Sequence, residues 1–148
     1  MKNLARVFIV CLTSFSLWSC QAPAIPKDVA KDISDSFIKA TTSGKYPEAF
    51  KLVNQKEFFT ARSDDQWIAY YDAISKELGP VVSIKLSHEQ ADDRFSGRFY
   101  TYVYSIKHEN GFTKEIVTLV QEINSNADLK IFAHRVEGGK LRKINQMF

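Results

Sequence analysis

Between residues 28 and 78 the apolar positions recur every three or four residues, which is the spacing of amphipathic helices. The predicted helices span about residues 28–43, 47–54 and 63–78. Gly44 suits the left-handed conformation that follows a helix end, and Pro47 suits the first turn of the next helix. Ser63 and Gln66 have the spacing of a capping box at the start of the third helix, and Gly79-Pro80 ends it.

After Pro80 the period changes to two, the alternation that is typical of β-strands. We predict four strands, at about residues 82–88, 97–109, 112–123 and 129–136. In the first strand one phase is expected to be buried, namely Val82, Ile84, Leu86 and His88, and residues 91–96 are predicted to be a loop. Asn110-Gly111 predicts a tight hairpin between the second and third strands. The third strand has apolar residues in both phases, which predicts that both of its faces are covered.

The second strand has the most unusual pattern, because three tyrosines share one of its faces: Tyr100, Tyr102 and Tyr104. His108 follows in the same phase, whereas Phe99 and Val103 fall on the opposite face. The helices precede the strands in the chain, so we expect the tyrosine face to lie against the helices. The other face is then expected to point outward.

Three helices followed by four strands with short connections predict an α+β domain over residues 28–136. In this arrangement the N-terminal helices pack on one face of a four-stranded antiparallel sheet. Residues 137–148, with three basic side chains after Gly138-Gly139, are predicted to be a basic C-terminal tail.

The N-terminus has the pattern of an export signal. Two basic residues precede an apolar run, residues 7–18, which has the length of a signal-peptide core and is too short to span a bilayer. The run ends in Leu17-Trp18-Ser19-Cys20, which resembles the bacterial lipoprotein cleavage box. We therefore predict a lipoprotein signal peptide at residues 1–19 and acyl chains such as palmitate on Cys20. Residues 20–27 would form a short tether, with the domain facing the periplasm from the outer or cytoplasmic membrane. Signal cleavage after Ala22-Pro23-Ala24, which releases a soluble periplasmic or secreted protein, is the alternative.

Charge and cysteine content exclude several classes of function. The 20 basic and 17 acidic residues become 18 and 17 once Lys2 and Arg6 leave with the signal, a net charge of +1 instead of +3. Such a balance argues against nucleic acid as a partner. The two cysteines, Cys11 and Cys20, both precede the domain, so it has no thiol for a disulfide, a thiolate metal site or a nucleophile. We expect no cofactor and no metal.

Three segments carry a family resemblance: residues 44–50 (GKYPEAF), 63–67 (SDDQW) and 78–82 (LGPVV). They resemble small exported proteins of a family of unknown function that is similar to the nuclear transport factor 2-like, cystatin-like cone superfamily. The resemblance implies a curved sheet wrapped round the helices, a conical pocket at the wide end and dimerisation through the outer sheet face. Enzymes of this type, such as ketosteroid isomerases, need an acidic base inside the cone, and we expect no Asp or Glu beside the tyrosines.

The candidate pocket residues are the aromatic and histidine side chains of the helices and strands: Tyr100, Tyr102, Tyr104, His88, His108, Trp67 and Tyr71. For the strand tyrosines the alternative is a purely structural aromatic ladder, which we favour. No catalytic signature is present. The sequence therefore favours a non-catalytic envelope module that binds a protein or a small ligand. A small pocket enzyme of isomerase or hydrolase type, with a strand tyrosine as donor and a histidine as base, is the alternative.

Overall fold

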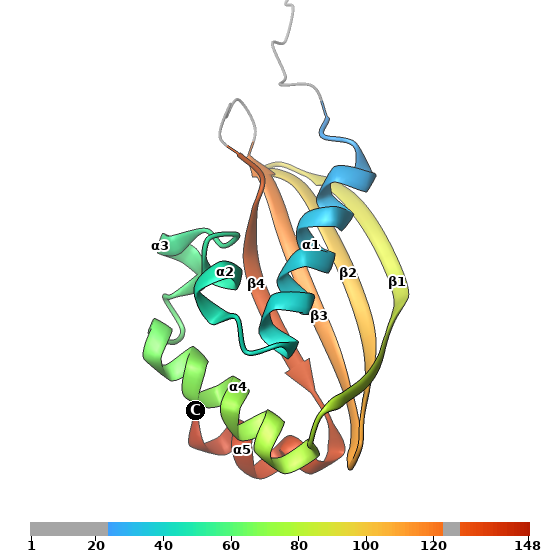
Figure 1. Cartoon of the computed structure of the whole chain (residues 1–148). Coiled ribbons are helices and arrows are strands. Elements are labelled where there is room, and N and C mark those ends of the chain that lie inside the picture. Colours follow the sequence, from blue (N-terminus) through green and yellow to red (C-terminus); the bar gives the residue numbers. More distant parts are fainter. Residues whose placement is uncertain (1–23, 123–127) are drawn as a thin grey trace, which may run out of the picture.

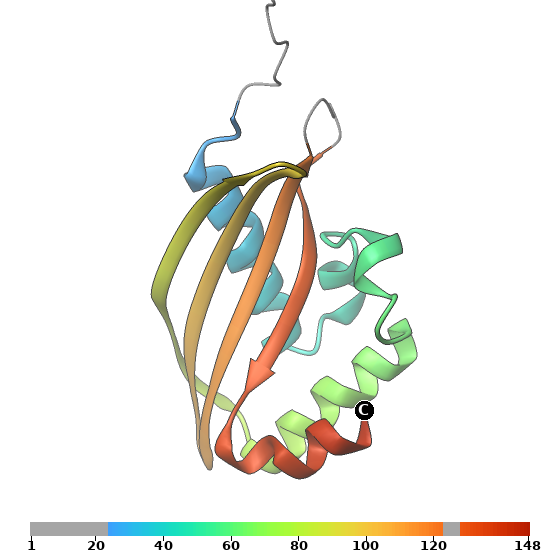
Figure 2. The ribbon, with the colours of Figure 1, turned by 180° about the vertical axis from the view of Figure 1, so that it is seen from behind.

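A computed structural model describes residues 24–122 and 128–148 of the chain. The helices lie on one face of a curved four-stranded antiparallel sheet with the strand order β1-β2-β3-β4, as Figures 1 and 2 show from opposite sides. The strands are β1 (Val81–Arg94), β2 (Gly97–His108), β3 (Gly111–Glu122) and β4 (Lys130–Glu137). The predicted α+β fold class is thus confirmed.

The helices of the N-terminal half begin and end close to their predicted limits. They are α1 (Lys27–Thr42), α2 (Tyr46–Phe50), α3 (Gln55–Phe58) and α4 (Asp64–Leu78). Gly44 and Gly79 have φ values of +70° and +74°, as a helix end in the left-handed region requires. The capping box is complete, because Ser63 Oγ accepts from the Gln66 amide while Gln66 Oε1 accepts from the Ser63 amide. The predicted second helix is too long, because α2 ends at Phe50, and α3 is a separate short helix that Asn54 caps by accepting from the Glu57 amide.

Strand β1 differs from its prediction in length and in burial. It continues through residues 91–94, which were expected to be a loop, and it forms one edge of the sheet. The expected buried phase is wrong: Val82, Ile84 and His88 are exposed, and Leu86 is half-buried. Two register shifts in its ladder with β2 break the strict alternation, and an edge strand is paired on one side only.

Strand β2 turns its tyrosine face toward α1, and all three rings are buried. Their hydroxyl groups fasten the strand to the segment around α1: Tyr100 donates to Ile25 O at 2.6 Å, Tyr102 to Lys27 O at 2.8 Å, and Tyr104 to Ser34 Oγ at 2.9 Å. Phe99 and Val103 lie half-exposed on the other face. The tyrosines therefore form the wall on which the first helix packs.

The predicted basic tail is wrong, because the chain end is folded onto the body. A 3-10 turn, η1 (Gly139–Leu141), leads into α5 (Arg142–Met147), which lies beside α4 (Figure 2). Leu141 and Ile144 are buried, and Tyr70 OH donates to Asn145 Oδ1 at 2.8 Å. The apolar side chains three residues apart explain the difference, since they form one face of a helical turn between the basic residues.

The predicted signal peptide at residues 1–19 and Cys20 lie outside the described residues, as do residues 21–23 and 123–127. Within the described part of the chain, no helix is both long and apolar enough to cross a membrane.

Candidate functional site

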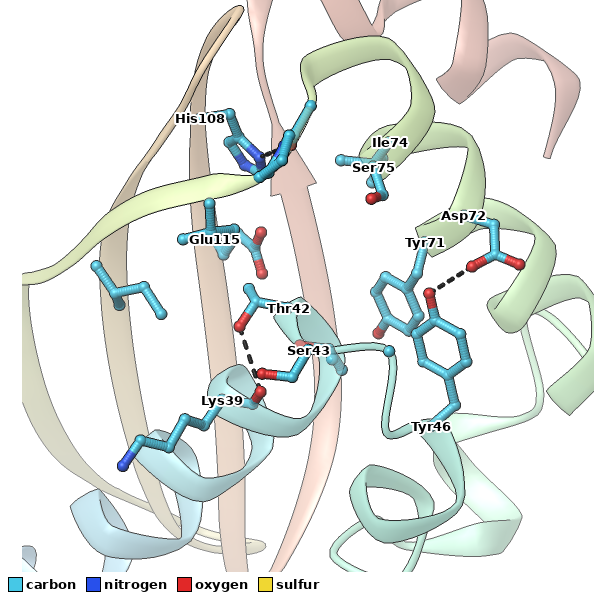
Figure 3. A pocket seen from close by; sticks show the side chains of 16 residues that line it. Lys39, Thr42, Ser43, Tyr46, Tyr71, Asp72, Ile74, Ser75, His108 and Glu115 are labelled. Atoms are coloured by element: carbon cyan, nitrogen blue, oxygen red, sulfur yellow. Dashed lines mark hydrogen bonds between the residues drawn. The ribbon is translucent and has the colours of Figure 1, made fainter.

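A half-open pocket of about 660 Å³ lies between the C-terminal end of α1, the middle of α4 and the start of β1 (Figure 3). Ile74, Val81 and Ile84 provide apolar lining, and the polar lining includes Thr42, Ser43, Ser75, His108 and Glu115. A pocket of this size and mixed lining is in the range of small-molecule sites.

The pocket exists because the helices diverge at this level. α1 ends at Thr42, and the left-handed Gly44 turns the chain toward α2. The helix therefore stops before the end of the sheet at which β2 and β3 are connected (Figure 1). On the far wall Tyr46 stacks on Tyr71 at 5.7 Å between ring centroids and donates a hydrogen bond of 2.6 Å to Asp72 Oδ1. Burial and this bond raise the pKa of Tyr46 well above its ordinary value. The hydroxyl is therefore a fixed donor at neutral pH.

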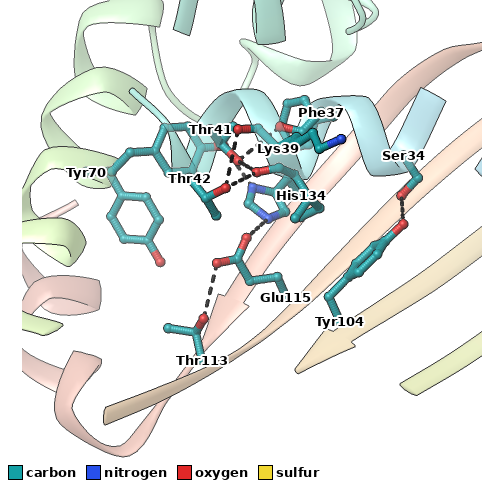
Figure 4. A network of polar contacts seen from close by, with 12 residues as sticks. Ser34, Phe37, Lys39, Thr41, Thr42, Tyr70, Tyr104, Thr113, Glu115 and His134 are labelled. Atoms are coloured by element: carbon teal, nitrogen blue, oxygen red, sulfur yellow. Dashed lines mark hydrogen bonds and ion pairs between the residues drawn. The ribbon is translucent and has the colours of Figure 1, made fainter. Parts of the chain in front are cut away.

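Glu115 of β3 lines the pocket and is itself buried. Among the described residues of the lining, it is the one buried carboxylate. Its Oε2 lies 3.0 Å from His134 Nε2 on β4, and His134 Nδ1 lies 2.8 Å from Tyr71 OH on α4 (Figure 4 shows the first contact). Burial, followed by the charge of Glu115, raises the pKa of Tyr71 well above 10. Tyr71 stays protonated and can donate to His134.

The hydrogen-bond network also extends from Glu115 toward the β2–β3 hairpin. Thr113 Oγ1 donates to Glu115 Oε1 at 3.2 Å, and His108 Nε2 lies 3.2 Å from Thr113 Oγ1. His108 Nδ1 lies 3.2 Å from the carbonyl oxygen of Gly79. Five side chains from three strands and one helix thus form a continuous polar path through a largely apolar interior.

The proton positions along this path follow from the donors and acceptors. The Gly79 carbonyl can only accept, so His108 Nδ1 carries a hydrogen. Thr113 Oγ1 carries a single hydrogen and lies 3.2 Å from both Glu115 Oε1 and His108 Nε2, so it can donate to only one of them at a time.

The expectation that no acidic residue lies beside the tyrosines is wrong. Glu115 is paired directly with Tyr104 in the β2–β3 ladder, on the inner face of the sheet. The hairpin turns at Glu109-Asn110, with His108 opposite Gly111, instead of at the predicted Asn110-Gly111. With either the predicted or the observed turn, Glu115 lies opposite an even-numbered residue of β2, which is the phase of the tyrosines. Residue pairing across the hairpin therefore indicates that this carboxylate lies on the tyrosine face.

The structure divides the predicted pocket residues into two groups. Tyr71 and His108 line the pocket. The others lie outside its lining: Tyr100, Tyr102 and Tyr104 pack on α1, and Trp67 stacks between Phe58 and Tyr71 in the core. His88 is exposed on the edge strand, next to Gln90.

His88 and His108 do not form a pair. His88 is opposite Val103 and His108 is opposite Val81, so the two histidines lie five positions apart along β2, about 17 Å at strand spacing. No group of three potential metal-ligating side chains occurs within residues 24–122 and 128–148.

Comparison with solved structures identifies the fold. A nuclear transport factor 2-like protein from Cytophaga hutchinsonii superposes with a TM-score of 0.53 at 12% identity, over 78% of this chain and 99% of that one. A provisionally assigned ketosteroid isomerase from Shewanella frigidimarina gives 0.51 at 14% identity, over 73% and 94%. Bd1075 of Bdellovibrio bacteriovorus gives 0.52 at 8% identity, over 75% of this chain and 40% of that protein. No family model and no curated protein matches the sequence. At these identities the similarity shows the fold, which is nuclear transport factor 2-like.

Proposed function

We propose that this chain, a nuclear transport factor 2-like fold with a half-open pocket, is an exported module that binds a small molecule and is held at a membrane by a lipid on Cys20. The observation that carries the binding function is the pocket of about 660 Å³ with one buried carboxylate in its lining. The N-terminal signal pattern supports export and the anchor.

The lining indicates the chemistry of the ligand. Ile74, Val81 and Ile84 favour an apolar body, and Glu115 favours a hydrogen-bond donor on it. Each oxygen of Glu115 already accepts one hydrogen bond from the protein, which leaves one lone pair on each for a ligand N–H or O–H group. We therefore expect an amide, alcohol or amine on a largely apolar skeleton.

The pocket is tested by filling it. Ser75→Trp places a large ring at the mouth, whereas Lys76→Trp puts the same ring on the exposed side of α4, outside the lining. Native mass spectrometry of protein from its producing cell should show a small-molecule adduct on the parent and on Lys76→Trp, but not on Ser75→Trp. An adduct retained by Ser75→Trp would contradict binding in this pocket.

A small enzyme is the second candidate function, because the carboxylate of Glu115 lines the pocket and contacts a buried histidine, His134. A base of this kind could transfer a proton within a β,γ-unsaturated ketone, which is an isomerisation. The Shewanella protein carries the provisional name of a ketosteroid isomerase. Incubation with such a ketone should then give the conjugated isomer, and Glu115→Gln should abolish the conversion. Conversion that survives in Glu115→Gln would remove this candidate.

Export and lipidation are tested directly on the mature protein. Cys20→Ala should abolish acylation and leave the protein in the soluble fraction or uncleaved, while the parent carries the mass of its acyl chains. A mature mass that begins after Ala24 would favour the soluble periplasmic alternative.

The outer face of the sheet is the proposed surface for a second copy. Apolar side chains of β2 and β3 lie half-exposed at its centre: Phe99, Val103, Ile116 and Val120. Sedimentation at tens of micromolar should show a dimer that Ile116→Lys dissociates and that the exposed, opposite-face change Glu77→Lys leaves intact. A monomeric parent would refute this surface.

A further inference from the structure

The turn between β1 and β2 carries a fully exposed aromatic side chain. Phe95 is 100% exposed at the tip of this hairpin. The tip lies at the end of the molecule where α1 begins, opposite the end formed by α4 and α5, and Figures 1 and 2 agree on this placement. Val29, in the first turn of α1, is a second exposed apolar side chain near this end.

Hydrogen bonds hold the segment that precedes α1 close to the β1–β2 hairpin. The Ile25 amide donates to Gln121 Oε1 at 3.0 Å, and the Ile25 carbonyl accepts from Tyr100 OH at 2.6 Å. Gln121 is opposite Arg98, three residues beyond Phe95. The chain therefore leaves the folded body at this edge and cannot swing to another side without breaking these contacts.

The distance from Cys20 to this edge is short. Ile25 is five positions after Cys20, which corresponds to at most about 18 Å of extended chain. An acylated Cys20 would hold this end of the molecule within that distance of the bilayer surface.

We propose that the β1–β2 turn docks on the lipid bilayer, with Phe95 inserted into the interfacial region beside the acyl anchor; this inference rests on the proposed lipidation of Cys20. A bare aromatic ring on a protruding turn is suited to a lipid interface, which accepts an isolated apolar side chain and needs no matching cavity. A protein partner would be expected to require a wider apolar patch.

The charges around the turn indicate hydrophobic docking. Arg98 pairs with Asp93, and Arg94 lies 3.7 Å from Asp92, so the turn has no net excess of basic charge. Its docking should therefore be insensitive to salt and should occur on zwitterionic lipid.

This orientation places the ligand pocket away from the membrane. The pocket lining begins at Lys39, twelve residues after Lys27 at the start of α1, or about 18 Å along the helix axis. The pocket would thus be accessible from the aqueous phase.

The test uses the full-length mature lipoprotein in phosphatidylcholine vesicles. Ser96→Cys supplies the single reactive thiol, because acylation blocks the Cys20 sulfur and Cys11 leaves with the signal peptide. A fluorescent nitrobenzoxadiazole label at position 96 is read against lipids with a nitroxide on the acyl chain. We expect strong quenching that high salt leaves unchanged. Phe95→Ser should lower the ratio of membrane-inserted to detached turn on the order of tenfold. The reason is that transfer of an aromatic ring out of water favours the buried state by at least this factor.

Phe112→Ser is the matched control. Phe112 is 66% exposed at the β2–β3 hairpin, at the opposite end of the sheet, so its loss should leave the quenching at position 96 unchanged. Equal quenching with and without Phe95, in protein whose mass shows acylation, overturns the docking alone. A mass without acyl chains overturns the proposed anchor and the docking that rests on it.

Discussion

His134 Nε2 on β4 lies 3.0 Å from Glu115 Oε2 on β3, and the two side chains are only 0% and 6% exposed. Glu115 also lines the pocket, and His134 contacts Tyr71 of α4. This pair therefore links the sheet to the helix on the other side of the pocket. Loss of either partner leaves the other as a buried polar group without its counterpart.

Removal of Glu115 should destabilise the protein strongly. Glu115→Leu leaves His134 and Thr113 without an acceptor, and we expect a loss of about 3–5 kcal/mol in the free energy of unfolding. Glu115→Gln keeps one accepting oxygen and should lose about 1–3 kcal/mol. Urea unfolding measures both, with the exposed Glu77→Gln as a control that changes by less than about 0.5 kcal/mol. Equal stability of Glu115→Leu and the parent would contradict the network.

The two histidines should differ in which nitrogen carries the hydrogen. Because Gly79 O can only accept, His108 should be protonated at Nδ1, whereas His134 should be protonated at Nε2 and accept from Tyr71 at Nδ1. Long-range proton–nitrogen correlation spectra distinguish these forms. Thr113→Val should change the His108 signals more than those of His134, and a His134 hydrogen on Nδ1 alone would refute the assignment.

The C-terminal helix should contribute to stability. Leu141 is fully buried, so Leu141→Ala is expected to lower the free energy of unfolding by about 2–5 kcal/mol. Lys143→Ala on the exposed side of α5 should change it by less than about 0.5 kcal/mol. If both variants unfold at the same urea concentration as the parent, the segment does not pack on the body.

Stability should fall at alkaline pH because buried tyrosines resist ionisation. Burial raises the pKa of Tyr102 to about 12 and that of Tyr71 well above 10, whereas an unfolded tyrosine ionises near pH 10. Their contribution is therefore complete below pH 10 and is lost as the pH rises through 10 toward 12. Unfolding free energies measured from pH 8 to 12 should fall less steeply in Tyr102→Phe than in the parent. Parallel curves would show that Tyr102 ionises equally in both states.

The local rules of helices and strands could be predicted from the sequence, because they depend on nearby residues. Ser63 and Gln66 cap α4 as their spacing predicts, and Gly79 ends it with a positive φ. The alternation of β2 likewise predicted which face carries the tyrosines. Such patterns act within one or two turns, so they do not depend on where the rest of the chain lies.

The candidate site was harder to predict from the sequence than the helices and strands. Tyr71 and His108 were found as candidates, but Glu115 was missed because β3 has apolar residues in both phases and its register was not counted across the hairpin. His88 appeared equivalent to His108 in phase, yet the register shifts of β1 place it on the exposed edge.

The sequence by itself determined the order and type of the main elements and the aromatic face of β2, because these follow from periodicity and from capping residues. Only the tertiary structure decided that the tyrosines pack on α1 while Glu115, His134 and Tyr71 meet beside the pocket. These three residues come from β3, β4 and α4, and their meeting depends on the register and curvature of the sheet. The physical reason is that long-range contacts are set by the packing of whole elements, which no local pattern encodes.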